Sequence, residues 1–307
     1  MNKTVEYIIE TGRDPITIVD FLREKGLSRR ILVAMKDNPS SILLNGQQAC
    51  GRTILNGGDI LTVQIPETEK SKTILPVKMD LDICYEDEDI LIINKAAKVP
   101  VHPSPGNYEN TLSNGILYYF QQQGLPFVFR CINRLDRDTT GLLIVAKNHF
   151  SASVLNRQMI QRQIHRTYLA VVSGHLPNEG TVCAPIGRHP GSAIQREVDF
   201  ETGEYAVTHF QCLDVQGDYS LAQLHLETGR THQIRIHMKY IGHPLPGDFL
   251  YNPDYRHFSR QPLHSWKLKF LHPCSSIPME FTAPVPGDIS SIFPICSDQT
   301  GEEIHTT

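Results

Sequence analysis

The sequence lacks long apolar runs and leader-like segments, and both absences exclude a class of protein. No stretch approaches the roughly 20 apolar residues that a membrane-spanning helix needs. The start, MNKTVEYIIETGRD, has neither the apolar centre of a signal peptide nor the basic, Ser-rich pattern of an import presequence. We therefore expect a cytoplasmic protein without a membrane span.

Paired cysteines are also absent. The seven cysteines stand singly, with no C-x-x-C pair and no Cys/His spacing that would close a tetrahedral metal site. We expect reduced and mostly buried thiols and no metal site built on cysteines.

The chain has no overall positive charge, and its formal net charge is −4. The distribution of charge is more informative than the sum. Residues 79–90 carry six acidic side chains and no base, which is typical of a solvated turn, whereas residues 130–166 carry seven bases against two acids. The basic tract favours a polyanionic partner.

The length of 307 residues predicts two structural units. In residues 1–70, Thr17 and Ser28 can cap short helices, and the strand-like runs SILL and ILTVQI follow, so we expect a small helix-then-sheet module. Residues 71–79 suit a linker and 291–307 a C-terminal tail. Residues 80–290 predict one α+β domain, in which Thr111 can cap a helix. Because its strands follow one another with few helices between them, we expect a mixed, largely antiparallel sheet flanked by helices and loops.

The stretch INRLDRDTTGLLIVAKN, residues 132–148, places charged residues directly before a strand-like run. Its D-x-D-x-T pattern could belong to a phosphatase in which Asp136 attacks phosphorus and Asp138 serves as acid/base beside Mg²⁺. Such a nucleophile ends a buried parallel strand that is apolar up to that point. Asn133 and Arg134 interrupt the apolar run here, which disfavours the phosphatase.

The stretch LETGRTHQIRIHMKYIGHPLPGD, residues 226–248, predicts a helix from Thr231 that carries Arg235 and Lys239 away from the core. Arg230, His232, Gln233, Arg235 and His237 together are too concentrated for ordinary surface. A metal site of His232 and His237 is disfavoured, because a spacing of five residues rotates them apart on a helix.

These stretches, in this order, resemble the RluA-type RNA pseudouridine synthases. YEDEDILIINKAAKVPVHPSPGN resembles the opening strand pair and loop of the family, INRLDRDTTGLLIVAKN its catalytic block, HRTYLAVVSG its Tyr strand and GRTHQIRIHMKYIGHPLPGD its signature helix. QPLHSWKLKFLHP and FTAPVP resemble its closing strands, and residues 1–70 resemble its S-four type (alpha-L) RNA-binding domain. The chain departs from the family at Asn133 (usually His), Ala96 and Lys98 (usually Pro and Gly) and Thr140 (usually Ser).

The resemblance implies an isomerase that breaks the N-glycosidic bond of a uridine in RNA and rejoins the base through C5. It implies neither a metal nor a nucleotide cofactor. It assigns catalysis to Asp136, with Arg235 as its ionic partner and Tyr168 as the surface that receives the flipped base. Without the resemblance, Tyr168 would be an ordinary core aromatic.

Further residues are matched to RNA binding. Arg134 resembles the arginine that fills the gap left by the flipped base, although an ion pair with Asp138 would also explain it. Leu263 would wall the pocket or simply fill the core. The complete set of expected substrate- and RNA-binding residues is Arg134, Arg230, His232, Gln233, Leu263 and His102.

The expected partner is RNA, with large-subunit ribosomal RNA first and transfer RNA second, and the expected state is a monomer. A non-catalytic RNA-binding protein is the alternative from another class.

Overall fold

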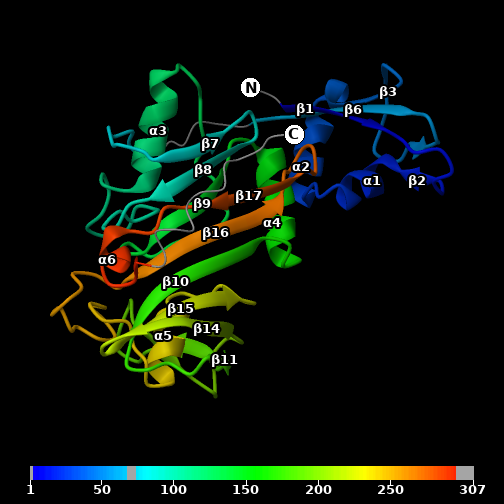
Figure 1. Ribbon diagram of the computed structural model, residues 1–307. Helices are drawn as coiled ribbons and strands as arrows, with labels where there is room; N and C mark the ends of the chain where they lie inside the picture. Colours follow the sequence, from blue (N-terminus) through cyan, green and yellow to red (C-terminus); the bar gives the residue numbers. More distant parts are fainter. Residues whose placement is uncertain (1–2, 68–73, 295–307) are drawn as a thin grey trace.

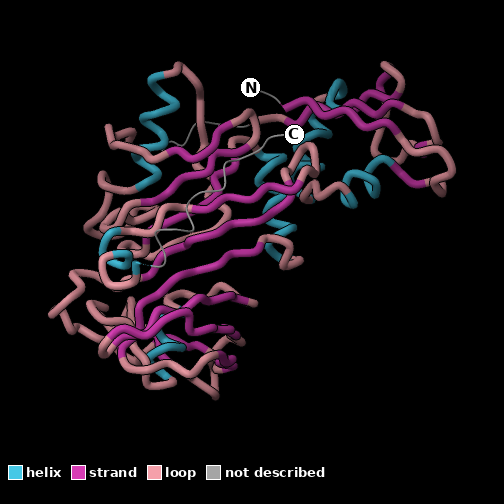
Figure 2. The backbone as a smooth tube through the Cα atoms, in the orientation of Figure 1, coloured by secondary structure: helices cyan, strands magenta, loops and turns pink. Residues whose placement is uncertain are grey.

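Two larger sheets organise the chain, and the smaller one lies to one side of the larger (Figure 1). The computed structural model describes residues 3–67 and 74–294. Strands make up most of the regular structure (Figure 2). Residues 74–79 of the expected linker contain no helix or strand. Residues 71–73 of that linker and 295–307 of the expected tail lie outside the described residues.

The smaller unit packs two short helices against a four-stranded antiparallel sheet of order β1-β6-β3-β4. Its helices begin where the sequence predicts, because Thr17 and Ser28 each accept a hydrogen bond from a backbone N–H of the first turn. The helix-then-sheet prediction is incomplete, since the strand β1 precedes the helices and pairs with β6. The elements are β1 (Lys3–Ile8), β2 (Ile16–Thr17), α1 (Ile18–Glu24), α2 (Arg29–Ala34), two 3₁₀ turns (Met35–Asp37 and Pro39–Ser41), β3 (Ile42–Leu44), β4 (Gln47–Gln48), β5 (Ile54–Leu55) and β6 (Ile60–Ile65).

The smaller unit docks on helix α4 (His149–Ile160) of the larger one. Phe150 joins the buried core of the smaller unit, and Oγ of Ser153 accepts a hydrogen bond from the N–H of Ser28 at 2.9 Å. The guanidinium of Arg157 donates to the carbonyl of Arg23 at 2.6 Å. Apolar packing and hydrogen bonds therefore both hold this interface.

The larger unit is built on a nine-stranded sheet of order β11-β14-β15-β10-β16-β9-β8-β7, with β17 paired to β16. Thr111 caps α3 with a capping box, as the sequence predicts. The strands are β7 (Ile83–Glu86), β8 (Ile90–Lys95), β9 (Thr140–Ala146), β10 (His165–Ser173), β11 (Glu179–Cys183), β14 (Val207–Gln216), β15 (Tyr219–Leu226), β16 (Leu263–Leu271) and β17 (Pro278–Thr282). Outside this sheet lie the strand pair β12 (Ile186–Arg188) and β13 (Arg196–Val198) and the helices α3 (Leu112–Gln122), α5 (Gln233–Tyr240) and α6 (Gly287–Ser290).

Helices cover both faces of this sheet, so its central strands are apolar on both sides. Leu91 and Ile93 of β8 enter one core with α3 and α5, whereas Ile90 and Ile92 enter another with α4. Tyr168 of β10 belongs to the α3 and α5 side.

One parallel pairing sets the place of the site. Within the described ranges, β16 and β9 are parallel, with Ser265 opposite Gly141, and every other named strand pair is antiparallel. Gly141 has a φ of +105°, and a Cβ there would lie 2.2 Å from the carbonyl oxygen of Ser265. A residue with a side chain could not occupy this crossing. The mixed, largely antiparallel sheet predicted from the sequence is confirmed.

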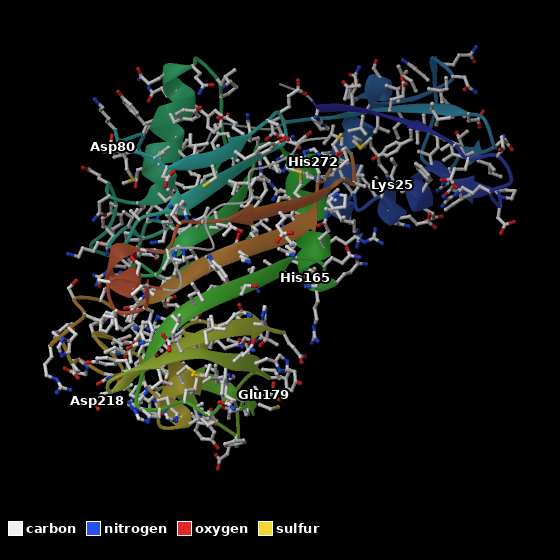
Figure 3. All side chains as sticks on the ribbon, in the orientation of Figure 1. Lys25, Asp80, His165, Glu179, Asp218 and His272 are labelled. Atoms are coloured by element: carbon white, nitrogen blue, oxygen red, sulfur yellow. The ribbon has the colours of Figure 1, made fainter. Side chains whose placement is uncertain are left out.

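The acidic run of residues 79–90 is not merely a solvated turn, so that prediction is wrong. Asp89 is 4% exposed. Its Oδ1 accepts hydrogen bonds from Asn148 and Ser151 at 2.8 and 2.9 Å, and its Oδ2 accepts one from Lys3 at 2.9 Å. Nε2 of His272 lies 2.9 Å from Oδ2 of the neighbouring Asp87. Figure 3 labels His272 on the side of the sheet that faces the smaller unit.

The prediction of mostly buried thiols is also wrong. Cys50, Cys183 and Cys274 are exposed, and Cys84, Cys131 and Cys212 are half-buried, all of them as free thiols. Cys296 lies outside the described residues. No helix in the described part of the chain is both long and apolar enough to cross a membrane.

The burial of Asp89 predicts a stability effect. Asp89→Asn replaces an acceptor with a donor that faces other donors, so we expect a loss of about 1–3 kcal/mol in unfolding free energy. Urea unfolding measures it. The matched control is Asp80→Asn in the same acidic run, because Asp80 is exposed (Figure 3). An equal and small effect of both variants would contradict the structural role of Asp89.

Candidate functional site

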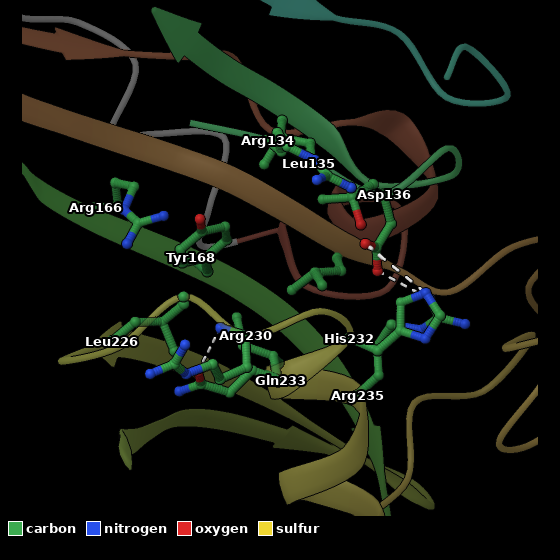
Figure 4. A pocket seen from close by; sticks show the side chains of 14 residues that line it. Arg134, Leu135, Asp136, Arg166, Tyr168, Leu226, Arg230, His232, Gln233 and Arg235 are labelled. Atoms are coloured by element: carbon green, nitrogen blue, oxygen red, sulfur yellow. Dashed lines mark hydrogen bonds and ion pairs between the residues drawn. The ribbon is translucent and has the colours of Figure 1, made fainter. Parts of the chain in front are cut away.

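Three residues from distant parts of the sequence form a chain of ion pairs. Nη1 of Arg235 donates to Oδ2 of Asp136 at 2.9 Å, whereas its Nε and Nη2 donate to the two oxygens of Asp248, each at 2.7 Å. The side chains of Arg235 and Asp248 are each 1% exposed, and that of Asp136 is 26% exposed. The guanidinium therefore joins a fully buried carboxylate to one that solvent reaches. Figure 4 shows its contact with Asp136.

The turn before α5 sets the direction of this guanidinium. His232 has a φ of +58°, in the left-handed region, and α5 begins at the next residue, Gln233. Oε1 of Gln233 accepts the N–H of Arg230 at 2.9 Å, and its Nε2 donates to the carbonyl of Val207 at 2.9 Å. The amide of Gln233 is thus engaged in holding the turn.

The helix prediction for this stretch is right in type and wrong in detail. The sequence predicts a start at Thr231, but α5 starts two residues later. Arg235 and Lys239 do not share an exposed face, because Arg235 is buried and Lys239 is exposed. The two carboxylates that receive Arg235 account for the difference.

Burial and charge fix the protonation of the groups around Asp136. Burial opposes the charged form of Arg235, but the hydrogen bonds to Asp248 and the charge of Asp136 outweigh it and raise the pKa of Arg235. Burial lowers the pKa of His232 to about 4, even though Asp136 opposes that shift. Nε2 of His232 lies 4.0 Å from Oδ1 of Asp136, and its Nδ1 lies 2.9 Å from the hydroxyl of Tyr251. Within the described part of the chain, Arg235 is therefore the one cation that contacts Asp136 at neutral pH.

A pocket with about 430 Å³ of empty space opens beside Asp136, and we call it the first pocket. Tyr168 lies on its β10 side and Leu263 at the start of β16. Figure 4 shows the side chains of Asp136 and Tyr168 on opposite sides of this space. The pocket is lined by Arg134, Leu135, Asp136, Thr139, Arg166, Tyr168, Leu226, Gly229, Arg230, His232, Gln233, Ile234, Arg235 and Leu263.

The structure brings together eight of the nine residues matched from the sequence. His102 does not line this pocket, and its ring packs against Phe129, with centroids 5.1 Å apart. Arg230 lines the pocket but also pairs with Glu204. Arg134 is exposed at the rim.

The alternative role of Arg134 as an ionic partner of Asp138 is wrong. Asp138 is instead held by the next arginine, Arg137, whose Nη2 donates to Oδ2 at 2.8 Å. Arg134 forms no ion pair within residues 3–67 and 74–294.

Two supports of the Asp136 loop were not predicted. Lys95 is 1% exposed and donates to the carbonyl oxygens of Ala96, Val99 and Arg137, at 2.7 to 2.9 Å. Burial lowers its pKa to about 7, against the attraction of nearby carboxylates. Asn133, where the family usually has His, accepts the N–H of Ile144 at 2.8 Å and ties the loop to β9.

Sequence reasoning also missed Asp248 and Arg166. Asp248 stands in the stretch GHPLPGD, between turn residues, and a lone acid after a helix rich in arginine was the available signal. Arg166 belongs to the basic tract of residues 130–166. It lies two residues before Tyr168 on β10, so the two side chains lie on the same face of the strand.

The arrangement also decides between the chemistries that the sequence left open. Asp136 precedes the strand β9 and does not end a parallel strand. Asp136 is hydrogen-bonded to Arg235 and Asp138 to Arg137, so the two carboxylates do not share a site. The phosphatase interpretation is therefore wrong.

The lowered pKa of His232 predicts a pH-dependent contribution to stability. The unfolded histidine binds a proton below about pH 6.5, whereas the folded one stays neutral down to about pH 4. Wild-type stability should therefore fall, relative to His232→Gln, as pH drops from 6.5 to 4, by up to about 1.4 kcal/mol per pH unit. Urea unfolding at stepped pH measures the difference. The control His175→Gln removes an exposed histidine. A constant gap between wild type and His232→Gln would contradict the buried neutral imidazole.

Comparisons with known proteins agree with this geometry. The family model described as RNA pseudouridylate synthase matches residues 89–240. The RNA pseudouridine synthase YjbO of Bacillus subtilis strain 168 is 42% identical over 278 residues, which cover 90% of this chain and 98% of that protein. The ribosomal large subunit pseudouridine synthase D of Escherichia coli strain K12 is 37% identical over 290 residues, covering 89% and 85%.

A solved structure agrees as well. Human RNA pseudouridylate synthase domain containing 1 matches with a TM-score of 0.57 and 30% identity, over 67% of this chain and 83% of that one. The resemblance to the RluA-type synthases is thereby confirmed, and the non-catalytic alternative is wrong, whereas the RNA-binding domain expected in residues 1–70 stays a prediction. The chain belongs to the RluA-type family of RNA pseudouridine synthases, which are isomerases that act on RNA.

Proposed function

We propose that this protein isomerises uridines in structured RNA, with large-subunit ribosomal RNA ahead of transfer RNA as the substrate, and that Asp136 is its essential carboxylate. The observation that carries this proposal is the half-exposed Asp136 at the mouth of the first pocket, oriented by a buried guanidinium and opposite Tyr168. Ribosomal RNA is favoured because a relative that covers 89% of this chain is named for the large subunit.

Asp136 is suited to attack the ribose or the base, or to deprotonate the sugar. It is charged and reachable, and a fixed cation contacts Oδ2 at 2.9 Å while Oδ1 faces the neutral His232. One oxygen is therefore anchored and the other is available to the substrate.

A base within a folded RNA must leave its stack before this carboxylate can reach it. In our proposal the flipped uracil lies against Tyr168, and Leu263 closes the pocket beside it, so the detached base stays near the ribose while it turns. In the same proposal, the hydroxyl of Tyr168 helps to remove the C5 proton.

Arginines at the rim would hold the RNA outside the pocket. Arg134 is exposed next to the catalytic loop and would enter the gap left by the flipped base. Arg166 and Arg230 would contact phosphates from the opposite rim. Of the nine expected site residues, His102 alone stands apart from the pocket, and we propose for it a contact with RNA beside Arg134.

The smaller unit extends this surface in our proposal. Residues 1–70 would act as an alpha-L type RNA-binding domain, with Arg29 and Arg30 exposed on α2, and residues 80–290 as the catalytic domain. A monomer without metal or nucleotide cofactor, in the cytoplasm, completes the proposal.

Asp136→Asn should abolish isomerisation. The substitution keeps the shape but removes the charge, so we expect a rate at least about 10³-fold lower. The assay measures tritium released from C5-labelled uridine in ribosomal and transfer RNA transcripts, with EDTA present. RNA affinity should stay within a few fold, and retained activity would contradict the role of Asp136. The control Asp218→Asn lies in an exposed hairpin turn (Figure 3) and should be fully active.

Tyr168 has two proposed roles that substitutions can separate. Tyr168→Phe keeps the aromatic surface and loses the hydroxyl, so RNA binding should stay near the wild-type value while turnover falls about 10²-fold. Tyr168→Leu should weaken binding as well, because stacking is lost. Single-turnover rates and filter binding measure these effects. Equal turnover of Tyr168→Phe and wild type would remove the hydroxyl from the mechanism.

A further inference from the structure

A second pocket, with about 660 Å³ of empty space, lies on the other side of the catalytic loop. It is lined by Lys98, Asn107, Asn110, Arg137, Asp138, Gly247, Phe249, Tyr255, Ser259 and Arg260. None of the three residues assigned to catalysis, Asp136, Tyr168 and Arg235, lines this pocket.

Two short segments connect the second pocket to the catalytic residues. Asp136 lines the first pocket, and the next two residues, Arg137 and Asp138, line the second. Asp248 anchors the catalytic guanidinium, and the residues on either side of it, Gly247 and Phe249, line the second pocket. A group bound in the second pocket would therefore contact residues that lie one or two positions from Asp136 and next to Asp248 in the sequence.

The lining combines aromatic rings with cations. Phe249 and Tyr255 are 44% and 52% exposed, so solvent reaches both rings. Arg137 lies over Phe249, 5.3 Å from the centre of the ring. Asp138 is the carboxylate of the lining, and its charge is satisfied by Arg137. Exposed rings beside unneutralised cations are what single-stranded nucleic acid binds.

Lys98 supplies the unneutralised cation. It is exposed, and it forms no ion pair among the residues that the structure describes. Its backbone has a φ of +64°, a left-handed conformation that favours glycine. The chain therefore keeps a long cationic side chain at the pocket mouth in spite of the local backbone geometry.

The second pocket also has a fixed shape. Gly247 has a φ of +68°, and a Cβ there would lie 2.5 Å from the carbonyl oxygen of Arg260. Arg260 is buried and donates to the carbonyl oxygens of Asp138 and Leu263 at 3.0 and 3.2 Å. The wall is thus tied to the same loop and strand that form the first pocket.

We propose that the second pocket binds an unpaired nucleotide of the substrate RNA next to the target uridine, with its base on Tyr255 and Phe249 and its phosphate at Lys98. This inference rests on the proposed function, since it takes the same RNA as the ligand. It adds a site that selects targets with an unstacked neighbour beside the uridine.

The test compares two double variants by equilibrium binding. Lys98→Ala/Tyr255→Ala removes one cation and one ring from the second pocket. The control Lys269→Ala/Tyr240→Ala removes the same groups from exposed positions that line neither pocket. Filter binding uses an unmodified large-subunit ribosomal RNA transcript at several salt concentrations, and thermal unfolding confirms that each variant is folded.

We expect the affinity of Lys98→Ala/Tyr255→Ala to fall about tenfold or more, because one stacked base and one phosphate contact are lost. Its slope of log affinity against log salt should fall by about one. Unchanged affinity, or an equal loss in the control, would overturn the proposal. The binding assay does not require turnover. A protein that forms no pseudouridine would contradict the proposed function, whereas the proposal for the second pocket depends only on the measured affinities.

A second measurement locates the nucleotide. Oligonucleotides that span a modified uridine carry an abasic residue immediately before or after it. Wild type should lose affinity for one of the two abasic RNAs, and Tyr255→Ala should show little further loss for that RNA. Additive losses at both positions would overturn the assignment of this pocket to the neighbouring base.

Discussion

The site depends on one buried guanidinium shared by two carboxylates. Arg235 gives Nε and Nη2 to Asp248 and keeps Nη1 for Asp136, so the buried pair fixes the direction of the donor that meets the reachable acid. Burying such a charge is unfavourable unless it is fully paired. A lysine has no planar fork and could not make both contacts in this geometry. Asp248 is therefore as necessary for the orientation of Asp136 as Arg235 itself.

Backbone geometry supports the same arrangement from three sides. Positive φ values occur at Gly141 directly after the catalytic loop, at His232 directly before α5, and at Gly247 directly before Asp248. Each marks the point where a chain segment turns abruptly into or out of the site. Two of the three are glycines without room for a Cβ, which limits how far these segments can drift. The carboxylates are thus placed by packed backbone before RNA arrives.

Local signals allowed much of the fold to be predicted. The caps at Thr17, Ser28 and Thr111 depend on neighbouring residues, and all three form as predicted. Partners that are distant in sequence were not predictable in the same way. The burial of Asp89 depends on Asn148 and Lys3, and the choice of Arg137 over Arg134 by Asp138 depends on loop geometry. The meeting of Asp136 with Tyr168 followed from the resemblance and not from any periodicity.

The placement of ion pairs reconciles a negative chain with a polyanionic substrate. Part of the acidic run is paired where it stands, because Glu86 pairs with Lys147 and Asp89 with Lys3. At the first pocket the balance is reversed: among the described residues, Arg134 and Arg166 form no ion pair, and Asp136 is matched by Arg235. Uncompensated positive charge therefore concentrates at the pocket mouth, where its field acts on phosphates within about 8–10 Å at physiological salt. The net charge of the chain does not oppose RNA binding, because none of the acidic side chains of residues 79–90 lines the first pocket.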